Sequence, residues 1–332
     1  MIIKLKKNTE PNILDKMTKQ LNAFQIKQED FDLLITSSGI KDVPVSFEKN
    51  IEEQWVFDSD MQLSSQSFNS NKTEIDLGTV KIGGSTNNTV LIGGPCSVES
   101  EEQIRSSAEL LKELSLSILR GGCFKPRTSP YSFQGLGKEG LLLLSKMRDE
   151  YGLKIISEVR DATQIKDVIE HTDIIQIGAK AMYDQGILRA CAKTHKPVMI
   201  KRGFGTSLQE FTQAAEFVLS GGNPNVILCE RGIRTFETKT RFTLDLCGVA
   251  WLQEYSNLPI ILDPSHAMGY AYGVPSLTKA CLAMGVDGLI IEAHPNPKVA
   301  KSDASQQLNH SEFKKLHQEL QPLAKSLGIN IL

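Results

Sequence analysis

The stretches PIILDPSH (residues 259–266) and GLIIE (288–292) contain the pattern that decides the fold. Each is a short apolar run that ends on a charged or metal-binding side chain. Outward along the chain, the same form recurs in TVLIGGPC (89–96), LSILRGGCFK (116–125), KIISE (154–158), DIIQIGAK (173–180), PVMIK (197–201) and VILCE (226–230). Short apolar runs rich in Ile, Val and Leu are typical of strands buried on both faces of a parallel sheet. The sequence therefore predicts parallel strands whose carboxyl ends carry reactive groups.

Helical patterns lie between these runs. Ser207 and Glu210 have the spacing of a capping box, and further helices are predicted over 100–115, 139–151, 162–171, 185–194, 241–256, 277–284 and 310–327. Strand and helix alternate through eight units, which favours a closed (β/α)8 barrel over residues 73–332. An open doubly wound sheet is the structural alternative. No P-loop motif occurs, and the one G-x-G-x-x-G match, GLGKEG (135–140), begins ten residues after the preceding apolar run instead of directly behind it, so a nucleotide site in such a sheet is not supported.

The first 72 residues follow a different pattern. MIIKLK predicts a strand, NILDKMTKQLNAF a helix and DLLITS a second strand, before the pattern decays into the polar segment SSQSFNSNKTE. We therefore expect residues 1–72 to form a small α+β accessory domain with a polar linker. IDLGTVKIG, followed by NNTVLIG, predicts a hairpin that leads into the first barrel strand.

Composition and charge exclude several classes of protein. The 332 residues can hold one barrel and a small extra module, and a net charge of −2 gives no electrostatic footprint for nucleic acid. No apolar stretch approaches the roughly 18 residues of a membrane span, and MIIKLKKNTE has no signal-peptide core. Six cysteines without a C-x-x-C pair indicate reduced thiols and a cytoplasmic location.

Cations gather at the predicted strand ends. RGGCFKPRTSPYSFQG (120–135) combines Arg120, Lys125 and Arg127 with the hydroxyl of Thr128 around a proline-fixed turn. Other strand ends add the cations Lys180, Lys201, Arg202, Arg231 and Arg234. Any one of them alone is best explained as a solvated loop charge. Together, on a slightly acidic protein, they predict a site for one or two substrates with several negative charges.

A second group, Cys96, His266, Glu292 and Asp303, has the chemistry of a metal site. A lone cysteine or histidine is more often structural, but a carboxylate after GLII needs a cation beside it. The first, seventh and eighth strands are neighbours in a closed barrel, so these side chains can converge. The mixed soft and hard ligands fit Mn, Fe, Co or Zn without distinguishing among them.

These segments also carry a family resemblance. GPCSVES, LRGGCFKPRTSPYSFQGLG, IIQIGAK, KRG, ILCERGIRTFE, DPSHAMG and IEAHPNP…SD occur in this order over about residues 73–330. They resemble 3-deoxy-D-arabino-heptulosonate 7-phosphate (DAHP) synthases of class I, in the short subtype related to KDO-8-phosphate synthases. The resemblance implies a metal-dependent, aldol-type transferase (3-deoxy-7-phosphoheptulonate synthase). It would condense phosphoenolpyruvate with erythrose 4-phosphate and water, releasing phosphate, as the first step of the shikimate pathway to chorismate and the aromatic amino acids.

Site roles follow from the resemblance, position by position. Cys96, His266, Glu292 and Asp303 match the metal ligands. The phosphoenolpyruvate contacts match Arg120, Lys125, Lys201 and Arg231, with the backbone of Ala179 and the side chain of Lys180 beside them. The second-substrate contacts match Arg127 and Thr128, and Arg234 is added to the substrate-binding group. Among the catalytic residues Lys125, Glu158 and His266, we expect Lys125 to protonate the aldehyde oxygen and Glu158 to orient or deprotonate the attacking water.

Departures from the family pattern leave alternatives open. Lys180 stands where the family usually has Arg, and Ala304 where glycine is expected, so a different aldose phosphate acceptor is the first alternative (a KDO-8-phosphate or aminoDAHP synthase-like enzyme). A catalytically inactive phosphosugar-binding barrel is the second. The opening strand and helix resemble the family's ferredoxin-like regulatory module, whereas the rest of residues 1–72 does not match it well. The resemblance also implies a homo-oligomer, either tetramer or dimer.

Overall fold

The computed structural model describes residues 1–125 and 129–332. Within these residues, eight parallel strands each pair with the next, and the last pairs with the first through Gly288–Val90 to Glu292–Gly94. Closure confirms the predicted barrel and excludes the open sheet. The strands are β7 (Asn88–Gly94), β8 (Ile118–Arg120), β9 (Lys154–Val159), β10 (Ile174–Ile177), β11 (Val198–Lys201), β12 (Val226–Glu230), β13 (Ile260–Leu262) and β14 (Gly288–Glu292). A short β15 (Asn330–Ile331) pairs with the start of β7.

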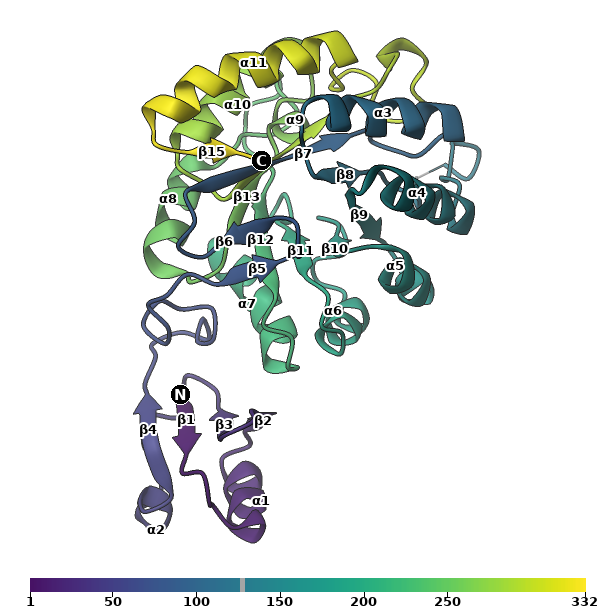
Figure 1. The fold of residues 1–332 in the computed structure, drawn as a ribbon. Helices are drawn as coiled ribbons and strands as arrows, with labels where there is room; N and C mark the ends of the chain where they lie inside the picture. The colour runs from purple at the N-terminus through teal and green to yellow at the C-terminus, as the bar shows by residue number, and fades with distance from the viewer. Residues whose placement is uncertain (126–128) are drawn as a thin grey trace.

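Helices surround this barrel (Figure 1). They are α3 (Glu101–Glu113), α4 (Lys138–Tyr151), α5 (Ile165–His171), α6 (Gln185–Ala192), α7 (Leu208–Ser220), α8 (Leu246–Tyr255), α10 (Val274–Ala283) and α11 (His310–Ser326), with a short α9 (Pro264–Met268) after β13. The predicted capping box forms at the start of α7. The helix predicted from residue 241 begins later, because the Asp245 side chain accepts a hydrogen bond from Gly248 N and caps α8 there. Single 3₁₀ turns occur at Ala162–Gln164, Ala271–Gly273 and Pro297–Val299.

The apolar side chains form two layers in the barrel. One layer fills the inside and includes Ile92, Ile156, Met199 and Ile290. It continues into Ile75 and Ile82 of the predicted hairpin, now observed as β5 (Glu74–Asp76) and β6 (Lys81–Gly83). The other layer lies between strands and helices. The hairpin covers the barrel interior at the amino ends of the strands, where Gly83 approaches Pro259 just before β13. The carboxyl ends of the strands therefore form the open end of the barrel.

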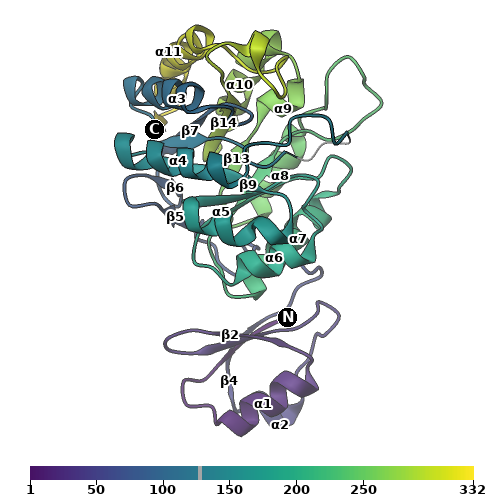
Figure 2. The ribbon, with the colours of Figure 1, turned by 90° about the vertical axis from the view of Figure 1, so that its right-hand side faces the viewer.

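A separate four-stranded sheet opens the chain (Figure 2). Its elements are β1 (Ile2–Leu5), α1 (Pro11–Gln20), β2 (Phe24–Lys27), β3 (Asp32–Ile35), α2 (Val45–Glu48) and β4 (Ile51–Trp55), and the strands are antiparallel in the order β2-β3-β1-β4. This β-α-β-β-α-β arrangement is ferredoxin-like. Its small core, with Ile3, Met17 and Phe47, is distinct from the barrel layers. The domain division at residue 72 stays a prediction.

The second half of this sheet corrects the prediction that the pattern decays after DLLITS. Helix α2 has only one turn, and β4 reads IEEQW with three exposed polar residues, so neither element has an apolar run to mark it. Strand β2 was missed for the same reason, since FQIK buries no residue fully.

The polar segment after β4 is bound to the barrel. The carboxylate of Glu216 on α7 accepts hydrogen bonds from the backbone N–H groups of Gln62 (2.9 Å), Leu63 (3.2 Å) and Ser64 (2.9 Å). Asn257 donates to the carbonyls of Leu63 and Ser65. These contacts make the predicted linker an ordered connection between the sheet and the barrel.

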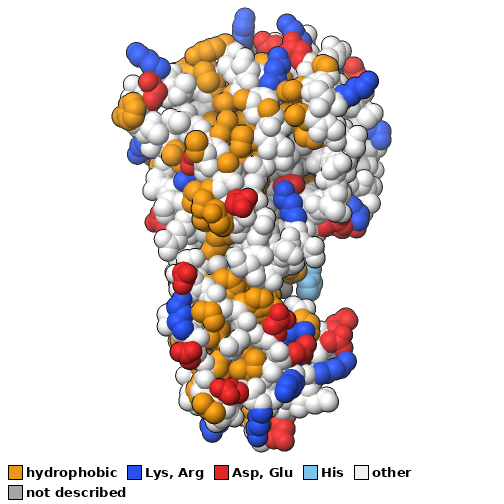
Figure 3. Space-filling view, turned by 90° about the vertical axis from the view of Figure 1, so that its left-hand side faces the viewer, with side chains coloured by type: hydrophobic (Ala, Val, Ile, Leu, Met, Phe, Trp, Pro, Cys, Tyr) orange, Lys and Arg blue, Asp and Glu red, His pale blue; other side chains and the backbone are white. Residues whose placement is uncertain are grey.

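Two surface features complete the fold. Hydrophobic side chains extend in a band from the barrel to the small sheet on the face in Figure 3. The elements on this side include α2 and α8, which carry the exposed Val45, Trp251 and Tyr255. Among the helices in the described part of the chain, none has both the length and the apolar character that crossing a membrane requires.

Candidate active site

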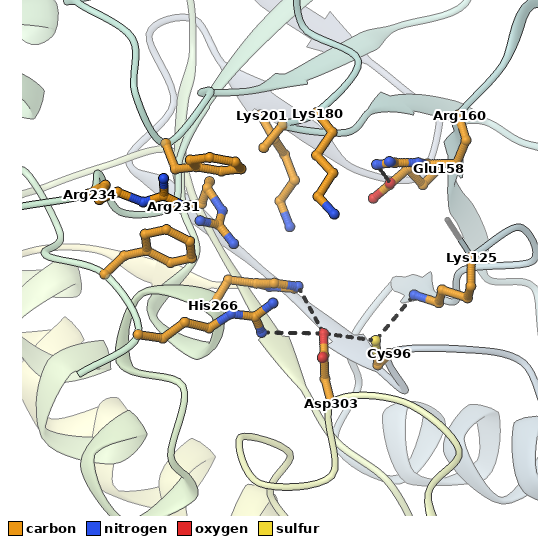
Figure 4. Close-up of a pocket in the computed structure, with 14 residues that line it drawn as sticks. Cys96, Lys125, Glu158, Arg160, Lys180, Lys201, Arg231, Arg234, His266 and Asp303 are labelled. Carbon is orange, nitrogen blue, oxygen red and sulfur yellow. Dashed lines mark hydrogen bonds and ion pairs between the residues drawn. The ribbon is translucent and has the colours of Figure 1, made fainter. Parts of the chain in front are cut away.

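A cavity of about 290 Å³ opens at the carboxyl ends of the strands (Figure 4). Its lining includes most of the predicted site residues: Cys96, Lys125, Glu158, Ala179, Lys180, Lys201, Arg231, Arg234, His266 and Asp303. Arg120 and Glu292 are buried and do not line the cavity; Arg120 Nη2 lies 3.1 Å from Glu292 Oε1. Arg127 and Thr128, predicted to contact the second substrate, lie outside the described residues. The structure thus brings together residues at or just after the carboxyl ends of seven barrel strands, β7 to β13, with Asp303 from the loop after β14.

The predicted metal-binding side chains converge on one side of the cavity. One ligand atom each from Cys96, Glu292 and Asp303 lies within 4.8 Å of the others. His266 Nε2 lies 3.5 Å from Glu292 Oε1 and 3.9 Å from Asp303 Oδ2. Asp303 has a φ of +44°, in the left-handed region that non-glycine residues rarely adopt. Its backbone therefore adopts an unfavourable conformation next to the other three side chains.

His266 is oriented by a carboxylate from the same segment. After β13, Asp263 Oδ1 accepts from His266 N (2.9 Å) and Asp263 Oδ2 lies 2.7 Å from His266 Nδ1. Burial lowers the pKa of His266 more than Asp263 raises it, so the imidazole is neutral and directs Nε2 to the cluster. Asp263 Oδ2 also pairs with Lys201 Nζ. Burial would raise the pKa of Asp263, but His266 and Lys201 hold it well below its usual value.

Lys125 and Cys96 form a second contact at the edge of the cluster. Lys125 Nζ donates to Cys96 Sγ over 3.1 Å. Burial and Glu292 raise the pKa of the Cys96 thiol to about 12, so a cation would have to displace its proton. Burial lowers the pKa of Lys125, but its interactions with Cys96 and Glu158 outweigh this and raise the pKa. Lys125 is therefore protonated at neutral pH.

Glu158 also lines the cavity, and two hydrogen bonds hold its carboxylate in place. Its carboxylate accepts from Gln176 Nε2 (2.6 Å) and from Arg160 Nη1. Burial alone would raise the pKa of Glu158, but Arg160, Lys125 and Lys201 lower it to about 2. A carboxylate with this pKa is a poor proton acceptor at neutral pH. It is better suited to accept hydrogen bonds than protons.

Two arginines, Arg231 and Arg234, stack on aromatic rings, and neither forms an ion pair with an acid in the described part of the chain. Arg231 lies 4.3 Å from the centroid of Phe242, and Arg234 lies 4.8 Å from that of Phe204. The two rings stack with centroids 5.5 Å apart. Arg231 Nη1 is buried without a hydrogen-bond partner among the described residues. Because a ring holds a guanidinium without neutralising it, this arrangement leaves positive charge available to an anionic ligand.

Arg202, counted among the rim cations in the sequence, does not face the cavity. It is buried and pairs with Glu230 (2.8 Å) and Asp245 (2.9 Å). Its neighbour Lys201 faces the cavity because consecutive residues at a strand end point to opposite sides. Arg202 is a structural residue that fixes the loop after β12.

Several cavity residues were missed in the sequence. Arg160 follows Glu158 by two positions, and the period of a strand could have indicated that both point inward. Asp263, which is fully buried and does not line the cavity, was also not predicted, because the sequence pattern was followed through it to His266. Arg241 and Phe242 had no usable signal, because a bridge between Ile233 and Thr243 folds their loop back onto the barrel.

Comparisons with known proteins agree with this geometry. A family model described as DAHP synthetase I matches residues 60–327. The chain belongs to this family. The DAHP synthetase I family model and the relatives confirm the predicted resemblance, the barrel and the enzyme class. A phospho-2-dehydro-3-deoxyheptonate aldolase from Thermotoga maritima is 45% identical over 270 residues, covering 81% of this chain and 79% of the relative.

Two further comparisons place the chain within its superfamily. A crystal structure of the Thermotoga maritima DAHP synthase superposes with a TM-score of 0.81 at 39% identity, covering 100% of this chain and 99% of that chain. A 2-dehydro-3-deoxyphosphooctonate aldolase from Arabidopsis thaliana is 32% identical over 258 residues, covering 71% of this chain and 88% of the relative. The alternative with another acceptor sugar is therefore less well supported than DAHP synthase.

Proposed function

We propose that this member of the DAHP synthetase I family condenses phosphoenolpyruvate with erythrose 4-phosphate and water to give DAHP and phosphate, the first step toward chorismate and the aromatic amino acids. One observation carries the proposal. A thiol, an imidazole and two carboxylates adjoin a cavity lined by Lys125, Lys180, Lys201 and Arg231. The first group suits a divalent cation and the second suits phosphate and carboxylate groups.

The donor set supports a resident divalent metal, with Mn, Fe, Co and Zn all compatible. Glu292 Oε1 is buried and lies 3.1 Å from Arg120 Nη2 and 3.5 Å from His266 Nε2, but it accepts no well-aligned hydrogen bond from the described residues. A cation held by Cys96, His266, Glu292 and Asp303 would satisfy it. When bound, such an ion supplies Lewis-acid polarisation of the aldehyde oxygen.

The other residues then have separate tasks. Arg120, Lys201 and Arg231 would bind the phosphate and carboxylate of phosphoenolpyruvate, beside Ala179 and Lys180, and Arg234 would add positive charge. As C3 of phosphoenolpyruvate attacks the aldehyde carbon, the protonated Lys125 would donate a proton to the aldehyde oxygen. The cationic C2 that results captures a water, and phosphate is released. The low pKa of Glu158 favours its orienting this water over deprotonating it.

Phosphate release tests the proposal directly. Purified protein is treated with a chelator, supplied with each metal in turn, and assayed with phosphoenolpyruvate and erythrose 4-phosphate or arabinose 5-phosphate. We expect metal-dependent release with erythrose 4-phosphate. Phosphate release only with arabinose 5-phosphate would support the KDO-8-phosphate synthase-like alternative. No release with either sugar would support the catalytically inactive phosphosugar-binding barrel. His266→Ala should lose the metal response, whereas the exposed Tyr272→Ala should keep it.

The proposal also covers the cellular compartment and the oligomeric state of the enzyme. We infer a cytoplasmic homo-oligomer, either tetramer or dimer, in which residues 1–72 form an accessory module. The six cysteines, all within the described residues, are unpaired, which suits a reducing compartment. The exposed hydrophobic band in Figure 3 suits an interface between subunits. Light scattering coupled to gel filtration measures the oligomeric state, and a monomer would contradict the proposal.

A further inference from the structure

Two consecutive glutamines, Gln306 and Gln307, are buried behind the predicted metal ligands. Each is 1% exposed. They follow Asp303 in the loop between β14 and α11, and neither lines the cavity. Amide side chains this deeply buried need partners for both their donor and their acceptor.

Gln307 ties together two segments that carry ligands. Its Oε1 accepts from the backbone N of Cys96 over 2.9 Å, and its Nε2 donates to the carbonyl of Ser302 over 2.9 Å. Ser302 immediately precedes Asp303. One amide thus holds the end of β7, which presents Cys96, against the loop that presents Asp303.

Gln306 fixes the orientation of the Glu292 carboxylate by a hydrogen bond. Its Nε2 donates to Glu292 Oε2 over 2.6 Å, while its Oε1 accepts from Arg241 Nη1 over 2.7 Å. This hydrogen bond occupies one carboxylate oxygen and leaves Oε1 directed toward His266. Arg241 Nη1 also lies 3.4 Å from Asp303 Oδ2, so Gln306 links Glu292 to the surroundings of Asp303.

The partners dictate an amide at both positions. Cys96 N and Arg241 can only donate, whereas the Ser302 carbonyl and the ionised Glu292 can only accept. This also fixes which way each amide points. Glutamate would offer no donor to Glu292, and an apolar residue would leave buried polar groups unsatisfied.

We propose that Gln306 and Gln307 are positioning residues that preassemble the divalent-cation site by fixing the Cys96 backbone and the Glu292 carboxylate. The inference rests on the metal dependence proposed above. Groups that hold metal ligands contribute substantially to metal affinity, and losing one typically weakens binding about 10- to 100-fold. The two glutamines should therefore matter for the cation more than for the fold.

Metal affinity tests this inference apart from catalysis. Gln306→Met and Gln307→Met keep the length of the side chain and remove its hydrogen bonds. Gln321→Met is the matched control, because Gln321 is exposed on α11 and its side chain hydrogen-bonds, within the described residues, only with His317. The dissociation constant for Zn²⁺ is measured on chelator-treated protein by competition with a chromophoric chelator. We expect both variants to bind about 10- to 100-fold more weakly and the control to match wild type.

The cobalt form gives a second readout that a merely structural role would not change. Gln307→Met should alter the sulfur-to-cobalt charge-transfer absorption because Cys96 loses its backbone anchor, whereas Gln306→Met should leave that absorption in place. If either Met variant fails to fold, the Asn variant keeps both groups one methylene shorter and should show an intermediate loss. Affinities within twofold of wild type for both positions would overturn the inference. Failure of the wild-type protein to bind any metal would instead overturn the proposed function.

Discussion

Replacing Asp263 by Asn should weaken both the barrel and its predicted metal site, because one buried carboxylate serves two partners. Asp263 is fully buried, pairs with the 3%-exposed Lys201, and lies 2.7 Å from His266 Nδ1. Asparagine keeps the shape but removes the charge. Lys201 would then be a buried ammonium without its anion, and His266 would lose the group that orients it.

The expected magnitude follows from these contacts. Breaking a buried ion pair by removing one partner costs about 3–5 kcal/mol of unfolding free energy. Losing the carboxylate behind a metal-binding histidine weakens metal binding about 10- to 100-fold. The pKa of Asp263 is held well below its usual value of about 4, so this stabilisation is present above that pH and disappears as the pH falls toward the folded-state pKa. The difference between wild type and variant should therefore shrink in acid.

Urea unfolding of metal-free protein at pH 7 measures the stability term. In a Trp55→Phe background, fluorescence reports only Trp251 and hence the barrel. Adding Lys201→Met to Asp263→Asn should recover much of the loss, because it removes the unpaired charge. The exposed Asp58→Asn is the control and should change stability by less than about 0.5 kcal/mol. A loss below about 1 kcal/mol, or no recovery in the double variant, would refute the reasoning.

Three further predictions concern the cavity and the connection to the small sheet. Phe242→Leu should raise the KM for phosphoenolpyruvate about 2- to 30-fold with little change in kcat, because Arg231 loses its ring; Phe242→Tyr should restore it, and an unchanged KM would exclude this role. Lys125→Met should lower kcat about 10²- to 10⁴-fold if Lys125 is the proton donor, and steady-state turnover within a few-fold of wild type would exclude that assignment. Glu216→Ala should speed limited proteolysis within residues 61–65, since three backbone N–H groups lose their acceptor, whereas cleavage at the wild-type rate would show that other contacts hold this segment.

The strand-end pattern located much of the cavity for a simple reason. In a barrel of parallel strands, every carboxyl end lies at the same opening, and neighbours in sequence are neighbours in space. A side chain at or shortly after the carboxyl end of a buried strand, such as Cys96, Glu158 or His266, is therefore expected near the others before any coordinates exist. The alternation of strand and helix through eight units favoured closure of the sheet into a barrel.

The strand-end pattern did not predict the paths of the loops. Arg241 and Phe242 reach the cavity only because the loop after β12 folds back, and Arg202 turns into the protein to meet Glu230. Hydrogen bonds in the folded chain decide both outcomes, and no local periodicity records them. Strand β4 was not predicted from the sequence, because it is stabilised by pairing with β1 and has no apolar run of its own.

The amino-acid sequence alone determined the alternation of strands and helices, the open end of the barrel, and the kinds of side chain gathered there, because hydrophobic period and strand direction are local properties. Only the tertiary structure decided that Asp263 orients His266, that aromatic rings hold Arg231 and Arg234, and that Gln306 and Gln307 hold the predicted metal ligands. Apart from Asp263 and His266, which are three positions apart, these contacts join separate segments of the chain, and the geometry of all of them depends on how loops and side-chain rotamers settle once the core has packed.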